Sequence, residues 1–380
     1  MMRTALLLRR LSANPLWSLV LTTTAIATAA TFAVSCNNGT TEGSTDSFDR
    51  RSMLRNIAEN FIIPSYSELQ SKVNAMQAAV NAFTASPSEA ALRAAQQAWE
   101  EAYTAWQYAC TFDFGPATTS TGTLFQKIGV FPTNAARIEE RIQQRNFSTD
   151  DFSRDTRGFN AVEYLLFSDS TLAQIISRFS NPDRRQYLQA IVADIKANVD
   201  ATANAWQRYR AEFITNDGTS VGSSTSMLFN EFVKSFEHIK NFKVGLPAGK
   251  RPGQTRPEPQ KVEAFYSGKS VKFIREHLQA IEMIYLGMHR RTGIDDLGFD
   301  DYLRSVPNGA ALVISTLAQL ELVKQRMNAL PDAPLSQTIV SNFAVVDAFH
   351  TELQRHTRFF KSEMASLLSL TITFSSGDGD

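Results

Sequence analysis

The feature that most limits the possible folds of this sequence is the spacing of its apolar residues, which recur every three or four positions over long segments. The same period runs through residues 89–109, 184–213, 269–288 and 349–368. In the first of these segments the apolar stripe is formed by Leu92, Ala95, Trp99, Ala102, Tyr103 and Trp106. This period places apolar side chains on one face of an α-helix, so each segment predicts a helix that packs against others. Strand-like alternation is confined to the short run 370–374, and we therefore predict an all-α protein.

Segments rich in proline and glycine divide the predicted helices into two groups. The longest of these segments, VGLPAGKRPGQTRPEPQ from Val244, contains four prolines and three glycines and predicts an irregular excursion. Each half of the chain has room for about four helices of bundle length. We predict a domain over residues 51–380 made of two packed helical bundles, at about 51–215 and about 225–375. An old internal duplication would explain such halves, although they do not align convincingly.

The first 35 residues have the composition of a bacterial export signal. Three arginines lie among the first ten residues, and no charged residue occurs from Leu11 to Thr41. The apolar stretch ends in AVSC, which resembles a lipobox, where signal peptidase cuts and Cys36 receives lipid. An uncleaved anchor helix is the alternative, since about 20 apolar residues can span a bilayer. Residues 36–50 are small and polar, as in a flexible tether. We predict a lipoprotein signal peptide at 1–35 and a lipid-anchored protein of the bacterial cell envelope, at the outer membrane.

Charge and cysteine content exclude several classes of protein. Basic and acidic residues balance at 38 each, and removal of the three arginines before Cys36 would leave a slight acidic excess. A chain without a basic field is not expected to bind nucleic acid. The predicted partners are the membrane, through lipidated Cys36, and a possible metal, haem or envelope protein. The only other cysteine is Cys110, which lies among aromatic residues and is expected to be buried. An internal disulfide and a thiolate-rich zinc site are therefore excluded if Cys36 is acylated.

Six separated segments of the sequence match the pattern of one known family. In chain order they are FDFGPA from Phe112, FPTNAARIEERI from Phe131, GFNAVEYLLFS from Gly158, HIKNFKVGLPAGKR from His238, FYSGKSVKFIREHLQAIEMIYLG from Phe265 and LLSLTITFSSGDGD from Leu367. Together, and in this order, they resemble the imelysin-like proteins, which are also called imelysin peptidases. The resemblance covers residues from about 51 to 380. It implies two helical bundles, a location in the bacterial envelope and an association with iron or haem uptake. Some relatives are called peptidases, and others act as periplasmic iron-binding components.

The segment from Gly158 departs from the family's Gly-x-His-x-x-Glu motif at one position, where Asn160 replaces the histidine. Residues three apart share a helix face, so Asn160 and Glu163 can approach one ion or one ligand. An amide oxygen is a weak, neutral ligand that suits calcium better than Zn²⁺ or Fe²⁺. Glu163 is then the only metal ligand of the pair, and a weak one. We predict a polar structural or ligand-binding pocket, with a weakened site for iron or another divalent metal and a plain surface position as the alternatives.

Three more residues are candidates for the same pocket. A buried Glu163 needs a cation as its partner, and Arg157, Arg137 or Lys240 could provide it. The resemblance places Arg137 near the cleft, although its surroundings otherwise predict a charged outer face. Asp113 precedes a helix-ending turn and could face the pocket, with helix capping as the alternative. The predicted pocket therefore consists of Asn160, Glu163, Asp113, Arg137 and Lys240.

The remaining motifs predict no catalytic site. The five histidines are scattered along the chain and form no pattern of metal ligands. The string SGKS at 267–270 is not a phosphate-binding loop, because Glu263 occupies the position of its first glycine.

Three functions remain open: a non-catalytic binding lipoprotein that serves iron or haem acquisition or an envelope protein partner, a metal-dependent peptidase, and an interaction module that has lost its ligand. A metallopeptidase needs about three protein ligands and a general base, which the residues around Glu163 do not supply. Asn160 therefore favours the third function over the second and leaves the first open.

Overall fold

The computed structural model describes residues 48–374, which are mostly helical. Residues 1–47 lie outside the described part, and with them the predicted signal peptide, Cys36 and most of the tether. The described chain belongs to one compact unit, Asp46–Asp380. None of the helices in residues 48–374 combines the length and the apolar character needed to cross a membrane. The prediction of an all-α protein is confirmed.

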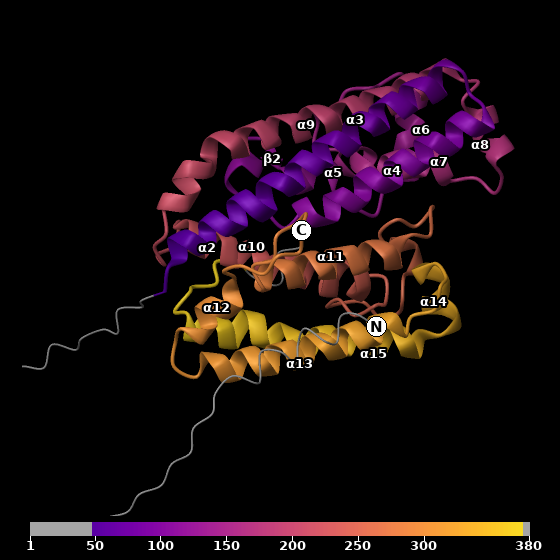
Figure 1. The fold of residues 1–380 in the computed structure, drawn as a ribbon. Coiled ribbons are helices and arrows are strands. Elements are labelled where there is room, and N and C mark those ends of the chain that lie inside the picture. Colours follow the sequence, from indigo (N-terminus) through magenta and orange to yellow (C-terminus); the bar gives the residue numbers. More distant parts are fainter. Residues whose placement is uncertain (1–47, 375–380) are drawn as a thin grey trace, which may run out of the picture. The chain divides into compact units, whose positions relative to one another are not determined.

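The first half of the described chain forms a bundle in which α3 packs against α4 and α9, and α7 packs against both α4 and α9. These helices are coloured indigo to magenta in Figure 1. Its elements are α2 (Arg50–Asn56), the π-helical turn η2 (Ile57–Ile62), α3 (Ile63–Ala85), α4 (Glu89–Ala109), η3 (Gly115–Ala117), β1 (Thr118–Thr119), β2 (Gly122–Thr123), α5 (Leu124–Ile128), α6 (Ala135–Gln143), η4 (Arg154–Thr156), α7 (Gly158–Phe167), α8 (Leu172–Arg178) and α9 (Pro182–Thr215).

The second half forms another bundle, in which α10 packs against α11 and α15, and α13 packs against α15. The prediction of two packed helical bundles is confirmed, and their internal duplication stays a hypothesis. The elements of this bundle are α10 (Ser224–His238), the π-helical turn η5 (Ile239–Gly245), η6 (Pro259–Lys261), α11 (Ser270–Tyr285), α12 (Phe299–Arg304), α13 (Gly309–Asn328), α14 (Leu335–Ser341), α15 (Phe343–Arg358), the π-helical turn η7 (Phe359–Met364) and α16 (Ala365–Leu367).

The long helices begin where local chemistry favours a helix start. At α4 the side chain of Ser88 accepts a hydrogen bond from the amide of Ala91. At α9 the side chain of Asn181 accepts from the amide of Asp183, and Pro182 occupies the first turn. Such caps satisfy amides that have no partner within the helix, and proline is compatible with the first turn because it lacks an N–H.

The strand-like alternation of residues 370–374 does not produce a strand. The only strands of the described chain are β1 and β2, which form a two-residue antiparallel pair. Instead, the side chain of Asn230 in α10 serves this segment: its Nδ2 donates to the carbonyl of Thr371 at 2.9 Å, and its Oδ1 accepts from the amide of Thr373 at 2.7 Å. The segment thus finds its backbone partners in one side chain, and it needs no second strand.

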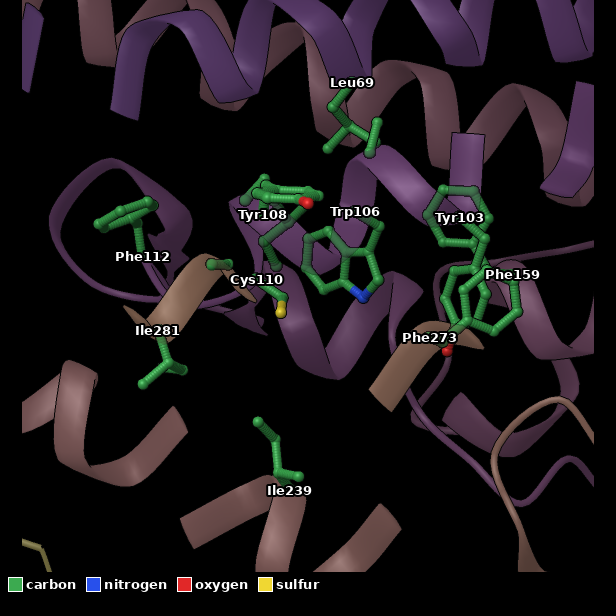
Figure 2. Packing of buried hydrophobic residues seen from close by; sticks show 14 of the residues in the cluster. Leu69, Tyr103, Trp106, Tyr108, Cys110, Phe112, Phe159, Ile239, Phe273 and Ile281 are labelled. Carbon is green, nitrogen blue, oxygen red and sulfur yellow. The ribbon is translucent and has the colours of Figure 1, made fainter. Parts of the chain in front are cut away.

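The two bundles meet along α4 and α11, and the contact is aromatic. Phe273 of α11 lies edge-on to Trp99 and Tyr103 of α4, with ring centroids 5.8 and 4.7 Å apart. In Figure 2 the side chains of α4 lie between Leu69 of α3 on one side and Ile281 of α11 on the other. Since all these side chains are buried, α4 is a core helix of both bundles.

Gly158, the first residue of α7, explains why its motif begins with glycine. Its φ is +76°, a conformation that side chains with a Cβ rarely adopt. A Cβ built on this residue would lie 2.5 Å from the carbonyl oxygen of Ile128, at the end of α5. The close approach of these backbones determines where α7, and with it Asn160, enters the first bundle.

We predict that Gly158→Ala destabilises the protein by about 2 kcal/mol or more, because it combines backbone strain with a clash. Urea unfolding of the protein from Asp46 onward measures the effect. Gly222→Ala is the control, since Gly222 has a φ of +93° but nothing within 4 Å of its built Cβ. An equal cost for the two changes would contradict the steric explanation.

Candidate functional site

Asn160 and Glu163 lie on α7 and are buried, with 2% and 1% of their surfaces exposed. Both line a cavity of about 270 Å³ between the two halves of the chain. The first half contributes these two residues and the segment before α6, and the second half contributes η6 and the segment that follows it. The remaining lining residues are Pro132, Thr133, Gln260, Lys261, Val262, Phe265 and Tyr266.

The amide of Asn160 is occupied on both sides by hydrogen bonds within the protein. Its Oδ1 accepts from the backbone amide of Ala264 at 3.3 Å, and its Nδ2 donates to the hydroxyl of Tyr103 at 3.0 Å. A backbone N–H can only donate, so the contact with Ala264 determines which way the amide points. Asn160 therefore links α7 to α4 and to the second half of the chain, and its oxygen already accepts one hydrogen bond.

Glu163 is a buried carboxyl group without a cation. Its Oε1 accepts from the amide of Ser267 at 2.7 Å, and no cation of residues 48–374 lies within ion-pair distance. Burial raises the pKa of Glu163 to about 7, an effect to which the charge of Glu263 adds and which the hydrogen bond from Ser267 opposes. The carboxyl group is thus close to half-protonated near neutral pH.

The three cations expected beside Glu163 lie elsewhere, and that expectation is corrected. Arg137 is exposed and pairs with Asp155 at 3.3 Å. Lys240 is buried but pairs with Glu237 at 3.4 Å. Arg157 is the residue before α7, where its side chain forms no ion pair with Glu163. The raised pKa of Glu163 is consistent with the absence of a cation, because burial disfavours the charged form of the carboxyl group.

Asp113 does not line the cavity either. Its Oδ1 accepts from the amide of Phe125 at 2.9 Å, in the first turn of α5. Burial raises the pKa of Asp113 to about 7, against the opposing hydrogen bonds from Thr123 and Phe125. This arrangement corresponds to the capping alternative, and the expected place of Asp113 in the pocket is corrected.

A buried ion pair lies behind Asn160. The Nζ of Lys243 is 3.0 Å from the Oε2 of Glu263, and each side chain is only 2% exposed. The hydroxyl of Tyr103 donates to the other oxygen of Glu263 at 2.7 Å, and Lys243 also donates to the side chain of Gln107. Burial and the charge of Glu263 raise the pKa of Tyr103 well above its usual value, so the hydroxyl stays protonated. A chain of hydrogen bonds therefore runs from Asn160 through Tyr103 to Glu263.

The sequence reasoning missed Lys243, Glu263 and Tyr103. Lys243 is the second lysine of the Lys-x-x-Lys segment, of which only Lys240 was chosen. Glu263 entered the reasoning only as the residue that excludes a phosphate-binding loop. Tyr103 was predicted only as part of the apolar stripe. That prediction is correct for its ring, but it did not include the hydrogen bonds of its hydroxyl group. The available signal was a lysine within one segment that resembles the family and a glutamate two residues before another.

The described residues contain no group of three or more histidine, cysteine, aspartate or glutamate side chains placed to hold a metal ion. The histidine nearest to a cysteine, His277, is buried, with its Nε2 2.7 Å from the hydroxyl oxygen of Ser235 and 3.6 Å from the sulfur of Cys110. Burial lowers the pKa of His277 well below its usual value, so it is a neutral core residue. Glu163 is left as a single carboxylate facing the cavity.

A family model described as Imelysin (Peptidase_M75) matches residues 62–352. The chain belongs to the imelysin family. This match confirms the resemblance to the imelysin-like proteins that the six sequence segments indicated. No curated protein matches the chain.

Two solved structures have the same fold as this imelysin-family chain. One is an imelysin-like protein from Psychrobacter arcticum, with 17% identity and a TM-score of 0.70, over 86% of this chain and 97% of that one. The other is a protein from Parabacteroides distasonis described as an iron-regulated protein A precursor, with 16% identity and a TM-score of 0.69, over 84% of this chain and 95% of that one. At these identities the likeness is one of fold.

We predict that the free energy of unfolding of Glu163→Gln, measured relative to that of the wild type, increases as the pH rises from 5 to 8. The raised pKa means that the folded state keeps a proton that the unfolded state loses above about pH 4.5. Wild-type stability therefore falls between about pH 4.5 and 7, by up to about 3 kcal/mol from this group, and the glutamine variant avoids that loss. Urea unfolding at several pH values measures it.

Glu100→Gln is the control for this experiment. Glu100 lies on α4, and although burial opposes the effect, hydrogen bonds and charge from Lys272 and Lys269 lower its pKa. A carboxyl group with a lowered pKa contributes its full stabilisation at every pH above its unfolded pKa. The difference in the free energy of unfolding between Glu100→Gln and wild type should therefore not change between pH 5 and 8. A Glu163→Gln difference that is equally flat would show that Glu163 is ionised in the folded protein throughout this range.

Proposed function

We propose that this imelysin-family protein is a non-catalytic binding lipoprotein of the bacterial cell envelope that serves iron acquisition. Its ligand would bind in the cavity at Asn160 and Glu163. The proposed anchor is lipid on Cys36, and the proposed location is the outer membrane.

The observation that carries the proposal is a carboxyl group that is buried, has no cation and faces a cavity of about 270 Å³. A buried ionisable group of this kind is costly unless it has a partner, and a ligand can be that partner. Phe265 and Tyr266 supply apolar walls, and Lys261, whose Nζ is 2.9 Å from the Oε1 of Glu258, also lines the cavity. Such a mixture of apolar walls and a few polar groups is typical of small-ligand sites.

The donor set favours binding over hydrolysis. Metal-dependent hydrolysis needs about three protein ligands and an activated water. Here Glu163 is one ligand, while the oxygen of Asn160 accepts from Ala264 and Glu263 is paired with Lys243. Iron bound at this site would have to bring most of its coordination sphere with it, as a chelate does. The name of the Parabacteroides distasonis structure, an iron-regulated protein, supports a role in iron metabolism for the fold.

We predict that free Fe²⁺ and Zn²⁺ bind more weakly than about micromolar, with a binding free energy of less than about 8 kcal/mol. Asn160→His would add a nitrogen ligand on the face of Glu163 and should tighten Zn²⁺ binding roughly tenfold or more, about 1.4 kcal/mol. Calorimetry on both proteins measures the change.

Asn160→Ala is the control, because it removes the amide without adding a ligand and should leave metal binding weak. Tight stoichiometric metal in the unmodified protein, lost in Glu163→Ala, would contradict the proposed binding mode. Casein hydrolysis by the pure protein, abolished in Glu163→Gln, would favour the peptidase alternative.

The lipid anchor has its own test. We expect Cys36→Ala to abolish lipidation and processing, so that the variant loses the mature protein's partition into the detergent phase. Detergent-phase partitioning and intact mass measure both effects. Unchanged processing and partitioning would instead favour the uncleaved anchor helix.

A further inference from the structure

A second cavity, of about 540 Å³ and largely open to solvent, lies between helix α3 and the loop that joins α11 to α12. It shares no lining residue with the cavity at Glu163. Three cationic side chains and one carboxylate line it, which leaves two positive charges in excess, or one when Glu101, the ion-pair partner of Lys72, is counted. The lining residues are Ser67, Glu68, Ser71, Lys72, Arg290 and Arg291.

The α3 side of this cavity presents two free hydroxyl groups. Ser67 and Ser71 are one helical turn apart and share a face of α3. Both residues are exposed, and within residues 48–374 neither side chain has a hydrogen-bond partner. Both hydroxyls are therefore available to donate to an oxygen atom of a ligand.

The opposite side is a loop held in place by two asparagines of the first half. The amide of Arg290 donates to the carbonyl of Asn60 at 2.8 Å. The side chain of Asn56 donates to the carbonyls of Gly287 and Leu297, at 2.7 and 2.9 Å. Asn60 lies in the π-helical turn η2 and Asn56 directly precedes it. Such turns are often found at functional sites.

The guanidinium of Arg290 is held in one orientation by contacts within the protein. It lies over the ring of Tyr108, 3.6 Å from the centroid, and its Nη2 is 2.9 Å from the Oε2 of Glu68. Its Nε is buried and has no hydrogen-bond partner in the described chain. A guanidinium held in one orientation loses little conformational freedom when it binds an oxyanion.

The other two cations are available. Arg291 is exposed and forms no ion pair within the described residues. Lys72 pairs with Glu101 at 2.9 Å, but both side chains are about 40% exposed, and exposed pairs of this kind are weak. Lys72 can therefore turn toward a ligand at little cost.

We propose that this cavity binds the phosphate group of an organic ligand. A phosphate monoester carries about two negative charges, which the cationic side chains of the cavity can neutralise, and its oxygens accept from arginine forks and hydroxyls. The volume is larger than inorganic phosphate requires, which leaves room for the organic part. The phosphate can belong to a soluble monoester or to a lipid headgroup, where it is a diester with one negative charge, since arginine forks and hydroxyls bind the oxygens of both.

Calorimetry on the full chain in non-ionic detergent, at about 50 mM NaCl, tests the site. The probes are glycerol 3-phosphate, a soluble monoester, and glycerophosphoglycerol, the deacylated headgroup of phosphatidylglycerol. Arg291→Gln should weaken binding roughly fivefold or more, because it removes a free cation. Ser71→Ala should weaken it roughly twofold or more, through the loss of one donor.

Arg208→Gln is the matched control, since Arg208 on α9 is exposed, lines neither cavity and forms no ion pair in residues 48–374. It should leave binding within about twofold of wild type. Binding of the monoester identifies a soluble ester as the source, and binding of the headgroup alone identifies a lipid; both support the site. No binding of either probe at about 10 mM, or equal losses in Arg208→Gln and Arg291→Gln, would overturn the proposal.

Discussion

The ion pair between Lys243 and Glu263 is the interaction on which the junction of the two bundles depends. Both side chains are almost fully buried, and each buried charge costs several kcal/mol unless it is paired and hydrogen-bonded. Both residues belong to the second half of the chain, but the hydroxyl of Tyr103 and the amide of Gln107 come from α4. Glu263 and Lys243 therefore reach these two hydrogen-bond partners only when α4 is packed against the second bundle.

The short segment that follows Glu263 connects this ion pair to the cavity. Glu263 points its carboxylate into the interior, the amide of Ala264 donates to Asn160, and the amide of Ser267 donates to Glu163. Ala264 has a φ of +55°, which is uncommon for a residue other than glycine. One buried carboxylate is thus balanced by a lysine, whereas Glu163 has no cation, keeps a raised pKa and lines the cavity. This asymmetry is what makes the cavity a candidate binding site.

Lys240 and Lys243 show what a sequence pattern cannot predict, namely which carboxylate a buried lysine pairs with. Both lysines lie in the π-helical turn η5, whose wider turn changes which residues share a face. Both are buried, and they differ only in the carboxylate they meet, Glu237 or Glu263. The position of Arg137 was difficult to predict for another reason. The charged residues around it correctly indicated an outer face, whereas the family resemblance indicated a cleft.

The sequence by itself determined where the helices lie, that their apolar faces are buried and that Asn160 and Glu163 share one helix face. These features depend on residues a few positions apart, and the period of the helix makes them visible. Only the tertiary structure decided the partners of the buried polar groups. Tyr103 and Glu263 are separated by 160 positions and Lys243 and Gln107 by 136. A buried charge requires a partner, but any of several cations or donors satisfies that requirement, and the packing of the two bundles selects which of them is within reach.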